Sequence, residues 1–461
     1  MNTFEDWSTK RVLLLGFGAE GRASLQYAAR CCAREIAIAD QAESLPLSAT
    51  ERSLISNAFL GTNWLRSISD YDIVIRTPGV PARYLQEPQR LAPNAQITSA
   101  TQIFLERHRD ITIGVTGTKG KSTTSSLIHH LLISASIDAK LAGNIGIPAL
   151  QHLTDPAKLF VLELSSYQLS DVRESPHVAV FLNLYPEHLD HHGDLQRYGE
   201  AKSKIARFQR PTDSLVIPAG SQLLSELTAC SSAKRVFWGC TSDTAWIEDE
   251  YFYYRCSKGK SHKICSVNSA LLKGPGNQRN ILAALAAVSH LSLPKEVLAR
   301  AIATFRPLPH RLEEVGVVNG VTYINDSIST VPEATINALE TFGEKVKTVL
   351  LGGYDRGISF TNLIEKIMST EVQTFILFPP SGERISAGLR EHPLFSANKH
   401  QIIEVTTMQA AVEHASRCTA SSSICLMSPA SPSFPIFKNF EERGAAFRAY
   451  VSKLPMGPLN E

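Results

Sequence analysis

Short apolar runs recur along this chain, and glycine turns and helical segments separate them. Apolar runs without polar alternation are typical of strands buried on both faces of a parallel sheet. The first part of the chain predicts strands at Arg11–Leu15, 36–39 and 72–76 and a helix at 23–33. These elements predict an α/β domain that closes near residue 105.

A second α/β unit is predicted over residues 106–305. Residues 234–268 differ from the rest, because short alternating runs such as YFYY are separated by Gly, Ser and Lys. They predict antiparallel hairpins. The other elements are expected as strands at 111–115, 160–164 and 178–183, a helix at 122–132, a turn at 274–276 and an alanine-rich helix at 280–291.

The prolines of the RPLPH segment, residues 306–310, are typical of a linker. A third α/β unit follows, with strands expected at 321–325, 346–351, 374–378 and 423–427. Boundaries near residues 105 and 306 divide the 461 residues into three domains, as expected at roughly 150 residues each.

Composition excludes several classes of protein. With 46 basic and 44 acidic side chains, the net charge of +2 gives no global attraction to nucleic acid or to an anionic membrane. The sequence contains no apolar run of 18 residues, and its first residues carry acids where a signal peptide carries bases. None of the eight cysteines forms a CxxC pair, so we expect reduced thiols in a cytoplasmic protein and no zinc site.

The glycine turn at residues 114–123, GVTGTKGKST, follows a predicted strand and opens a predicted helix. Closely spaced glycines let backbone N–H groups converge on phosphate oxygens. Lys121 can then reach the β- and γ-phosphates, and the Ser122 hydroxyl can hold Mg²⁺. The strict phosphate-loop pattern requires glycine where Val115 stands, so the turn predicts a variant nucleotide site.

A second glycine turn, Gly16-Phe-Gly18-Ala-Glu-Gly21, follows the first strand, and Asp40 ends the next. This pattern suits a dinucleotide such as NAD. Similar turns also hold other pyrophosphates or no ligand. A chain that already has a phosphate loop has less need of a nicotinamide.

Other polar residues are ambiguous from chemistry alone. Glu163 ends an apolar run, where it is either a Mg²⁺ ligand or a surface acid. The NLYPEHLDHH segment, residues 183–192, is either a metal site or a solvated loop, and we assign His191 and His192 to the solvated loop. By itself, Lys202 suggests a solvated helix lysine. His310 and Asp326 are either nucleotide contacts or linker and turn residues.

The motifs GTKGKST, LELSSYQL, NLYPEHLD followed by a lysine, GN–N–AALAA, PHR, NDS and SPASPSF–FKNFEERG occur in this order. This succession resembles the Mur ligases over essentially the whole chain, and within them the MurD type, which adds glutamate to UDP-N-acetylmuramoyl-L-alanine. The resemblance implies a UDP-binding Rossmann-like domain over 1–105, a central ATP-binding domain over 106–305 and a glutamate-binding Rossmann-like domain over 306–461.

It also implies an ATP-dependent, ADP-forming amide ligase of peptidoglycan precursor synthesis, working through an acyl phosphate. Cell-wall biogenesis, cell shape and cell division would depend on it. The implied partners are UDP-N-acetylmuramoyl-L-alanine, ATP, glutamate and two Mg²⁺ ions, and a monomer is expected.

The resemblance assigns roles to individual residues. The implied catalytic residues are Lys121, Lys202, His188 and Glu163. The implied metal ligands are Ser122, Glu163, His188 and a carbamylated Lys202. The implied ATP contacts are Gly117, Thr118, Gly120, Lys121, Ser122, Thr123, Asn277, Asn280, His310, Arg311 and Asp326. The implied UDP-substrate contacts are Gly16, Gly18, Asp40, Thr77, Pro78, Gly79, Asn144 and Ser165, and the implied glutamate contacts are Thr330, Arg356, Ser433 and Phe440.

Three positions depart from the family pattern. Ile328 and Arg356 stand where lysines are usual, and Gly276 replaces a histidine. Arginine can clamp a carboxylate through two hydrogen bonds, whereas lysine acts as a point charge. D-glutamate is the family default. L-glutamate, used by a subgroup that resembles this chain, is the alternative.

Three other functions explain less of the sequence. Folylpolyglutamate synthases share the phosphate loop and the carbamylated lysine but have no UDP-binding first domain of this kind. An NAD-dependent dehydrogenase leaves the GKS loop and Lys202 unexplained. A non-catalytic nucleotide-binding protein leaves unexplained the joint presence of Lys121, Glu163, His188 and Lys202.

Overall fold

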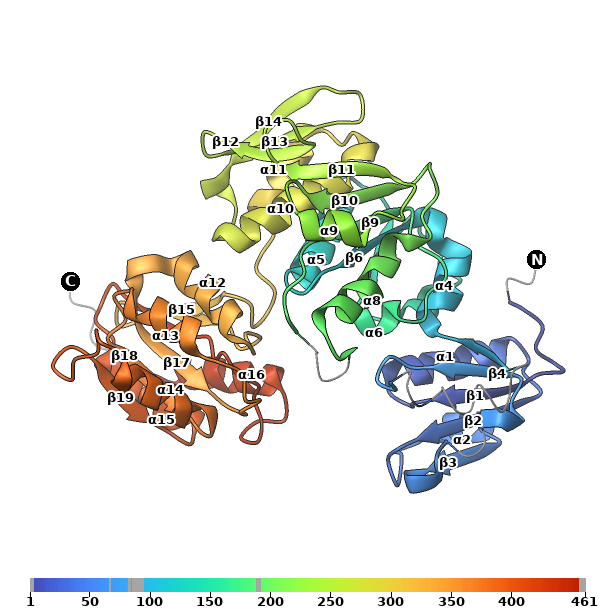
Figure 1. Ribbon diagram of the computed structural model, residues 1–461, viewed down its shortest axis with the longest axis horizontal. Coiled ribbons are helices and arrows are strands. Elements are labelled where there is room, and N and C mark those ends of the chain that lie inside the picture. Colours follow the sequence, from blue (N-terminus) through green and yellow to red (C-terminus); the bar gives the residue numbers. More distant parts are fainter. Residues whose placement is uncertain (1–3, 66–67, 82–83, 85–94, 188–191, 456–461) are drawn as a thin grey trace. The chain divides into compact units, whose positions relative to one another are not determined.

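In the computed structural model, three β-sheets organise the chain, and the predicted α/β class is confirmed (Figure 1). The structure describes residues 4–65, 68–81, 84, 95–187 and 192–455. Contacts group the chain into two compact units. The first comprises Met1–Ala270 with Arg279–Phe305, and the second comprises Leu271–Gln278 with Arg306–Glu461.

The N-terminal sheet is parallel, with strand order β3-β2-β1-β4-β5. Helix α1 begins at Ala19, earlier than the predicted residue 23, because the glycine turn leads directly into it. β3 and β5 were not predicted; they are only four and three residues long. The elements are β1 Arg11–Leu15, α1 Ala19–Arg30, β2 Glu35–Asp40, α2 Ala49–Leu54, β3 Asn57–Leu60, η1 Gly61–Asn63, η2 Ile68–Asp70, β4 Ile73–Arg76, β5 Gln96–Thr98, α4 Ala100–His108 and η4 Arg109–Ile111.

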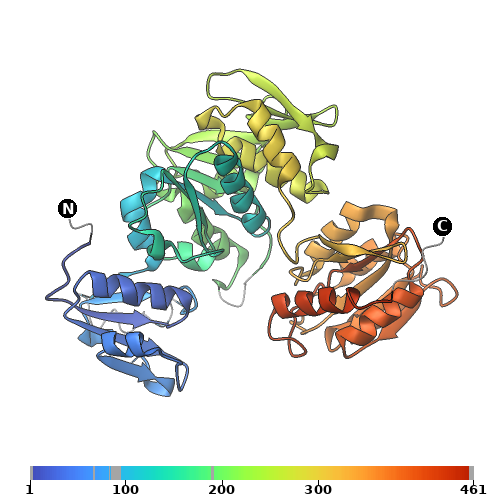
Figure 2. The same ribbon diagram turned by 180° about the vertical axis from the view of Figure 1, so that it is seen from behind.

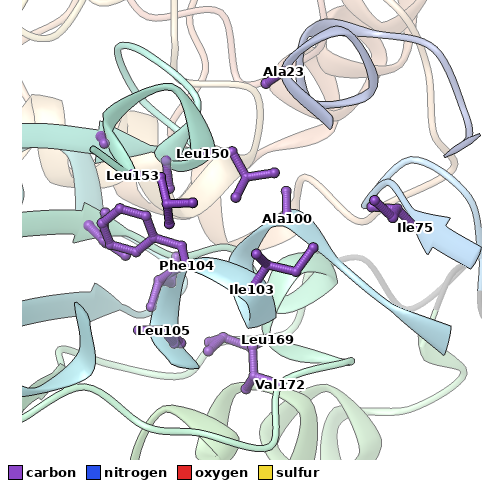
Figure 3. Packing of buried hydrophobic residues seen from close by; sticks show 14 of the residues in the cluster. Ala23, Ile75, Ala100, Ile103, Phe104, Leu105, Leu150, Leu153, Leu169 and Val172 are labelled. Carbon is purple, nitrogen blue, oxygen red and sulfur yellow. The ribbon is translucent and has the colours of Figure 1, made fainter. Parts of the chain in front are cut away.

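Both faces of this sheet are buried, which accounts for its uninterrupted apolar strands. Leu13 and Val74 belong to one cluster, while Leu14 and Ile75 belong to the other. The cluster that contains Leu14 and Ile75 continues into the central domain. There, side chains of α4 pack against leucines and a valine of the segments 149–153 and 169–172. Figure 3 shows this packing for Ile103, Phe104, Leu150, Leu153, Leu169 and Val172.

The central sheet has nine strands in the order β14-β13-β12-β11-β10-β9-β6-β8-β7. The prediction of hairpins over 234–268 holds for β12, β13 and β14, but β11 pairs in parallel with both β10 and β12. Helix α10 begins at Pro275, so the turn predicted at 274–276 and the helix start at 280 were wrong. The elements are β6 Thr112–Thr116, α5 Lys121–Ser134, β7 Ala139–Gly143, η5 Ala149–His152, β8 Leu159–Glu163, α6 Ser166–Leu169, β9 Val178–Phe181, α8 Leu195–Arg207, β10 Ser214–Pro218, α9 Gln222–Leu227, β11 Lys234–Gly239, β12 Ala245–Glu248, β13 Tyr251–Arg255, β14 Ser261–Ser266, η6 Val267–Ser269, α10 Pro275–Ala287, η7 Ser289–Leu291 and α11 Lys295–Thr304.

The C-terminal sheet has the order β15-β16-β20-β17-β18-β19, and β15–β16 is its antiparallel pair. Residues of α12, α13 and α14 pack on one face, and residues of α15 and α16 pack on the other (Figures 1 and 2). The elements are β15 Glu313–Val318, β16 Val321–Asn325, α12 Pro332–Phe342, η8 Gly343–Lys345, β17 Val346–Gly352, α13 Thr361–Met368, β18 Thr374–Phe378, α14 Ser381–Glu391, β19 Gln401–Glu404, α15 Met408–Cys418, β20 Ile424–Met427 and α16 Phe440–Val451.

None of the helices in the described residues has both the length and the apolar character needed to cross a lipid bilayer.

Candidate active site

The central glycine turn follows β6 and leads into α5, between the ends of the neighbouring strands β8 and β9. Ligands of parallel sheets bind at such edges. Gly120 adopts φ 86°, and a Cβ there would come within 2.3 Å of Asn280 Oδ1. Asn280 therefore lies against the turn. Ser122 and Thr123 are buried in the first turn of α5.

Asn183, which the sequence analysis did not single out, holds this turn in shape. Its Oδ1 accepts hydrogen bonds from the backbone N–H groups of Thr118 at 3.1 Å and Lys119 at 2.9 Å. Its Nδ2 donates to the Lys119 carbonyl at 3.0 Å. The signal available in the sequence was an asparagine just after a buried strand, at the start of the NLYPEH segment.

Two lysines converge on the Gly117 carbonyl. Lys121 Nζ donates to it at 3.0 Å, and Lys202 Nζ donates to it at 2.8 Å. The side chain of Lys202 is 1% exposed, so reading this residue as a solvated helix lysine was wrong. Burial, together with the nearby charge of Lys121, lowers the pKa of Lys202 well below its ordinary value.

Glu163 ends β8 beside this turn and is 2% exposed. Asn144 Nδ2 donates to its Oε1 at 2.8 Å, whereas its buried Oε2 has no hydrogen-bond partner among the described atoms. A buried carboxylate oxygen without a hydrogen-bond partner is a suitable ligand for a hard cation such as Mg²⁺. The alternative of a surface acid was therefore wrong.

Glu187 forms an ion pair with Lys119 at 3.0 Å, while the predicted ligand His188 lies outside the described residues. Among those that are described, no three His, Cys, Asp or Glu side chains form a metal cage. Mg²⁺ does not require one, because it commonly keeps water and substrate phosphates as ligands.

The N-terminal glycine turn lies at the corresponding edge of its own sheet. A Cβ on Gly16 would come within 2.0 Å of Thr77 Oγ1, so the turns after β1 and β4 are in contact. Thr77 is followed by Pro78 and Gly79. The Asp40 carboxylate accepts from the Phe17 N–H at 2.8 Å and thereby helps to shape the turn.

A chain of hydrogen bonds links this turn to the LELSSYQ segment. Gln168 Nε2 donates to Glu20 Oε1 at 2.6 Å, and Gln168 Oε1 accepts from the Ser165 N–H at 2.9 Å. Burial raises the pKa of Glu20. Sequence reasoning missed Glu20 and Gln168, since their pairing across 148 residues has no local signature.

In the second unit, two predicted nucleotide contacts have partners within the domain. His310 Nδ1 lies 3.0 Å from Asn325 Nδ2, and burial lowers the pKa of this histidine. Asp326 accepts from the hydroxyls of Ser329 and Ser428 at 2.5 and 2.8 Å. Burial raises the pKa of Asp326 to about 6.

Residue 276, where the family pattern has histidine, faces Asn337. A Cβ on Gly276 would come within 2.8 Å of Asn337 Oδ1, so a larger side chain would require that amide to move. Asn277 follows on the same helix and donates from Nδ2 to the Lys273 carbonyl at 2.9 Å.

The predicted glutamate contacts follow three neighbouring strands, β16, β20 and β17, and begin α16. Thr330 and Phe440 are partly buried, Ser433 is buried, and Arg356 is exposed in the loop after β17. The carboxyl ends of parallel strands share one edge of a sheet. The fold therefore gathers these residues at that edge.

Comparison with known proteins gives the same picture. The Mur ligase middle domain matches residues 115–288, and the Mur ligase, glutamate ligase domain matches residues 310–430. A UDP-N-acetylmuramoylalanine–D-glutamate ligase of Acetivibrio thermocellus is 32% identical over 96% of this chain and 97% of its own. A UDP-N-acetylmuramoyl-L-alanine–L-glutamate ligase of Micromonospora sp. is 34% identical over 97% of each chain.

Solved structures share the fold. A pseudomurein peptide ligase type C from Methanothermus fervidus has a TM-score of 0.60 at 15% identity and covers 96% of this chain and 99% of its own. The MurF ligase from Thermotoga maritima in complex with ADP has a TM-score of 0.59 at 17% identity, over 98% and 100%. The full-length relatives and the phosphate loop together establish that this chain belongs to the Mur ligase family of ATP-dependent ligases, with its three-domain α/β fold.

Proposed function

We propose that this enzyme joins glutamate to UDP-N-acetylmuramoyl-L-alanine with conversion of ATP to ADP and phosphate, in peptidoglycan precursor synthesis. Relatives named for this reaction match the chain over nearly its full length. The observation that carries the proposal is the convergence of Lys121 and Lys202 on the Gly117 carbonyl, in a turn shaped for phosphate.

The reaction proceeds in two displacements. A carboxylate oxygen of the alanine attacks the γ-phosphorus of ATP, forming an acyl phosphate and releasing ADP. The glutamate amine then attacks the acyl carbon and loses a proton, and the tetrahedral intermediate expels phosphate to leave an amide. The glycine turn and Lys121 stabilise the charge on the transferred phosphoryl group. Bound Mg²⁺, held by Ser122 and Glu163, would neutralise further phosphate charge, and Asn144 orients the Glu163 carboxylate.

Lys202 acts as a carbamate in this proposal. A neutral lysine amine adds to CO₂ and loses a proton, which gives an anionic carbamate that, together with His188, would hold a second Mg²⁺. The burial of Lys202 and its lowered pKa support this chemistry.

The three domains divide the substrates. Residues 1–105 bind the UDP group through Gly16, Gly18, Asp40 and the turn at 77–79, and residues 106–305 bind ATP. Residues 306–461 bind glutamate. Asn144 and Ser165 contact the UDP-substrate, and Arg311 completes the nucleotide contacts with His310 and Asp326. We further propose that the enzyme is cytoplasmic and monomeric. Size-exclusion chromatography with light scattering would test the oligomeric state by measuring the molar mass.

The stereochemistry of the glutamate follows the family default, D, unless the altered pocket selects L. Both kinds of relative match at similar identity. The L alternative rests on Ile328 and on Arg356, which can form two hydrogen bonds with a carboxylate.

Phosphate release with ATP, Mg²⁺ and UDP-N-acetylmuramoyl-L-alanine, with each glutamate isomer in a separate reaction, tests both points. Turnover with D-glutamate alone would confirm the default. Turnover with L-glutamate alone would establish the alternative and require an epimerase acting after ligation. Failure with both isomers would contradict the proposed substrates.

A further inference from the structure

Arg443, on α16, is a buried cation with uncharged partners. It is 2% exposed. Nε donates to Ser327 Oγ at 3.0 Å, Nη2 to the Ser327 carbonyl at 2.8 Å, and Nη1 to the Ser431 carbonyl at 3.0 Å. Burial lowers its pKa to about 9. Asp326 supplies an opposing charge but no hydrogen bond to this guanidinium. Burying a guanidinium whose hydrogen bonds go to a hydroxyl and two carbonyls is unfavourable, which points to a role beyond packing.

The partners of Arg443 lie in the loops that carry the proposed glutamate contacts. Ser327 precedes Thr330 in the loop after β16, and Ser431 precedes Ser433 in the loop after β20. Ser327 Oγ also donates to the Phe440 carbonyl at 2.8 Å, which fixes the start of α16. One side chain therefore connects three of the four segments.

The fourth segment, which carries Arg356, meets the same group. A Cβ on Gly353 would lie 3.3 Å from Arg443 Nη1 and 2.1 Å from the Pro432 carbonyl oxygen. The Tyr354 N–H donates to that carbonyl at 2.9 Å. The loop after β17 is thus seated against Arg443 and the loop after β20, and glycine at 353 permits the close approach.

We propose that Arg443 is a positioning residue for glutamate: it holds the four pocket segments in register and keeps a buried positive charge beneath a substrate with two carboxylates. This inference rests on the proposed function, which names glutamate as the amino acid. Charge buried away from water acts over a longer range than surface charge, because solvent screens it less.

Steady-state kinetics of the full-length Arg443→Lys enzyme test the proposal. Lysine keeps the charge but loses the fork of donors. The expected result is a rise of about tenfold or more in KM for the accepted glutamate isomer, with KM for ATP within about twofold of wild type. An unchanged glutamate KM, or an equal rise for glutamate and ATP, would overturn it.

Arg109→Lys is the matched control. Arg109 is 4% exposed in the first unit and donates to Asp213 at 2.6 Å and to the Ser175 carbonyl at 3.0 Å. Its substitution should lower the thermal midpoint without raising the glutamate KM. A rise equal to that of Arg443→Lys would mean that loss of any buried arginine has this effect, and would overturn the proposal.

Ser327→Ala decides the question if Arg443→Lys does not fold. It removes the acceptor of Nε and the donor to the Phe440 carbonyl, both parts of the proposed link between segments, and it leaves the two carbonyl acceptors of Arg443. We expect about a threefold or larger rise in glutamate KM, and no rise would overturn the proposal.

Wild-type enzyme is assayed in parallel: if it uses neither isomer, the proposed function fails and this inference fails with it. If it uses one, the variants test Arg443 alone.

Discussion

The phosphate loop and the proposed glutamate pocket are built in different ways. In the first, seven consecutive residues, GTKGKST, supply most of the groups, and Asn183 reaches across from the next strand to hold them. In the second, the groups come from four separate segments, and the hydrogen bond from Ser327 to Phe440 spans 113 residues. A site made by one loop can be recognised as a motif in the sequence. A site made by several loops also needs residues that hold the loops together, and these have no local sequence signature.

Among the variants that test this comparison, Lys202→Ala is expected to change the catalytic rate most. Removing the proposed carbamate should lower kcat by about 10²–10³-fold, because the group that would hold the second Mg²⁺ near the transferred phosphoryl group is lost. Short carboxylates such as formate should restore part of the rate. Lys204→Ala, on the same helix, is the control and should retain activity. Full activity of the Lys202 variant would remove the carbamate from the mechanism.

Arg356→Ala should be next in size. We expect KM for glutamate to rise about tenfold or more while KM for ATP changes little, because a charge-assisted pair with a carboxylate is lost. Initial rates at varied glutamate and ATP measure both constants. Arg384→Ala, which breaks the exposed pair with Asp355, serves as the control. Equal changes in the two constants would place Arg356 outside the pocket.

Asn183→Ala should affect the other site. Loss of its hydrogen bonds to the backbone of Thr118 and Lys119 loosens the phosphate loop, and KM for ATP should rise about fivefold, the equivalent of roughly 1 kcal/mol. KM for glutamate should stay near the wild-type value. The reverse pattern would show that the two sites do not separate as described.

The smallest effect concerns Asp326 and the pH dependence of stability. Its pKa, raised to about 6 in the folded protein from 3.8, means that the folded state binds this proton more tightly than the unfolded state. Its contribution to stability is present below pH 4 and is lost as pH rises to about 6. Thermal midpoints of wild type should therefore fall relative to Asp326→Asn over this range, by a few degrees. A constant difference between the two proteins would contradict the raised pKa.

Local chemistry determined what could be read from the sequence. The strands β1, β6 and β17 and the turn before Lys121 were predictable because apolar runs and glycines act over a few residues. β3 and β5 were missed because strands of four and three residues carry little pattern. The start of α10 was misplaced because Gly276 suggests a turn by propensity, while the structure accommodates it in a helix facing Asn337.

The sequence by itself thus determined the α/β class, the phosphate loop and the order of motifs that marks a Mur ligase. Only the tertiary structure decided that Lys202 is buried with its amine on the Gly117 carbonyl. It also decided that one oxygen of Glu163 has no hydrogen-bond partner among the described residues, and that Arg443 lies among the loops of the proposed glutamate pocket. The physical reason is that burial and desolvation depend on neighbours distant in the sequence. They change the pKa and reactivity of a side chain, but the residues next to it in the sequence carry no signal of that change.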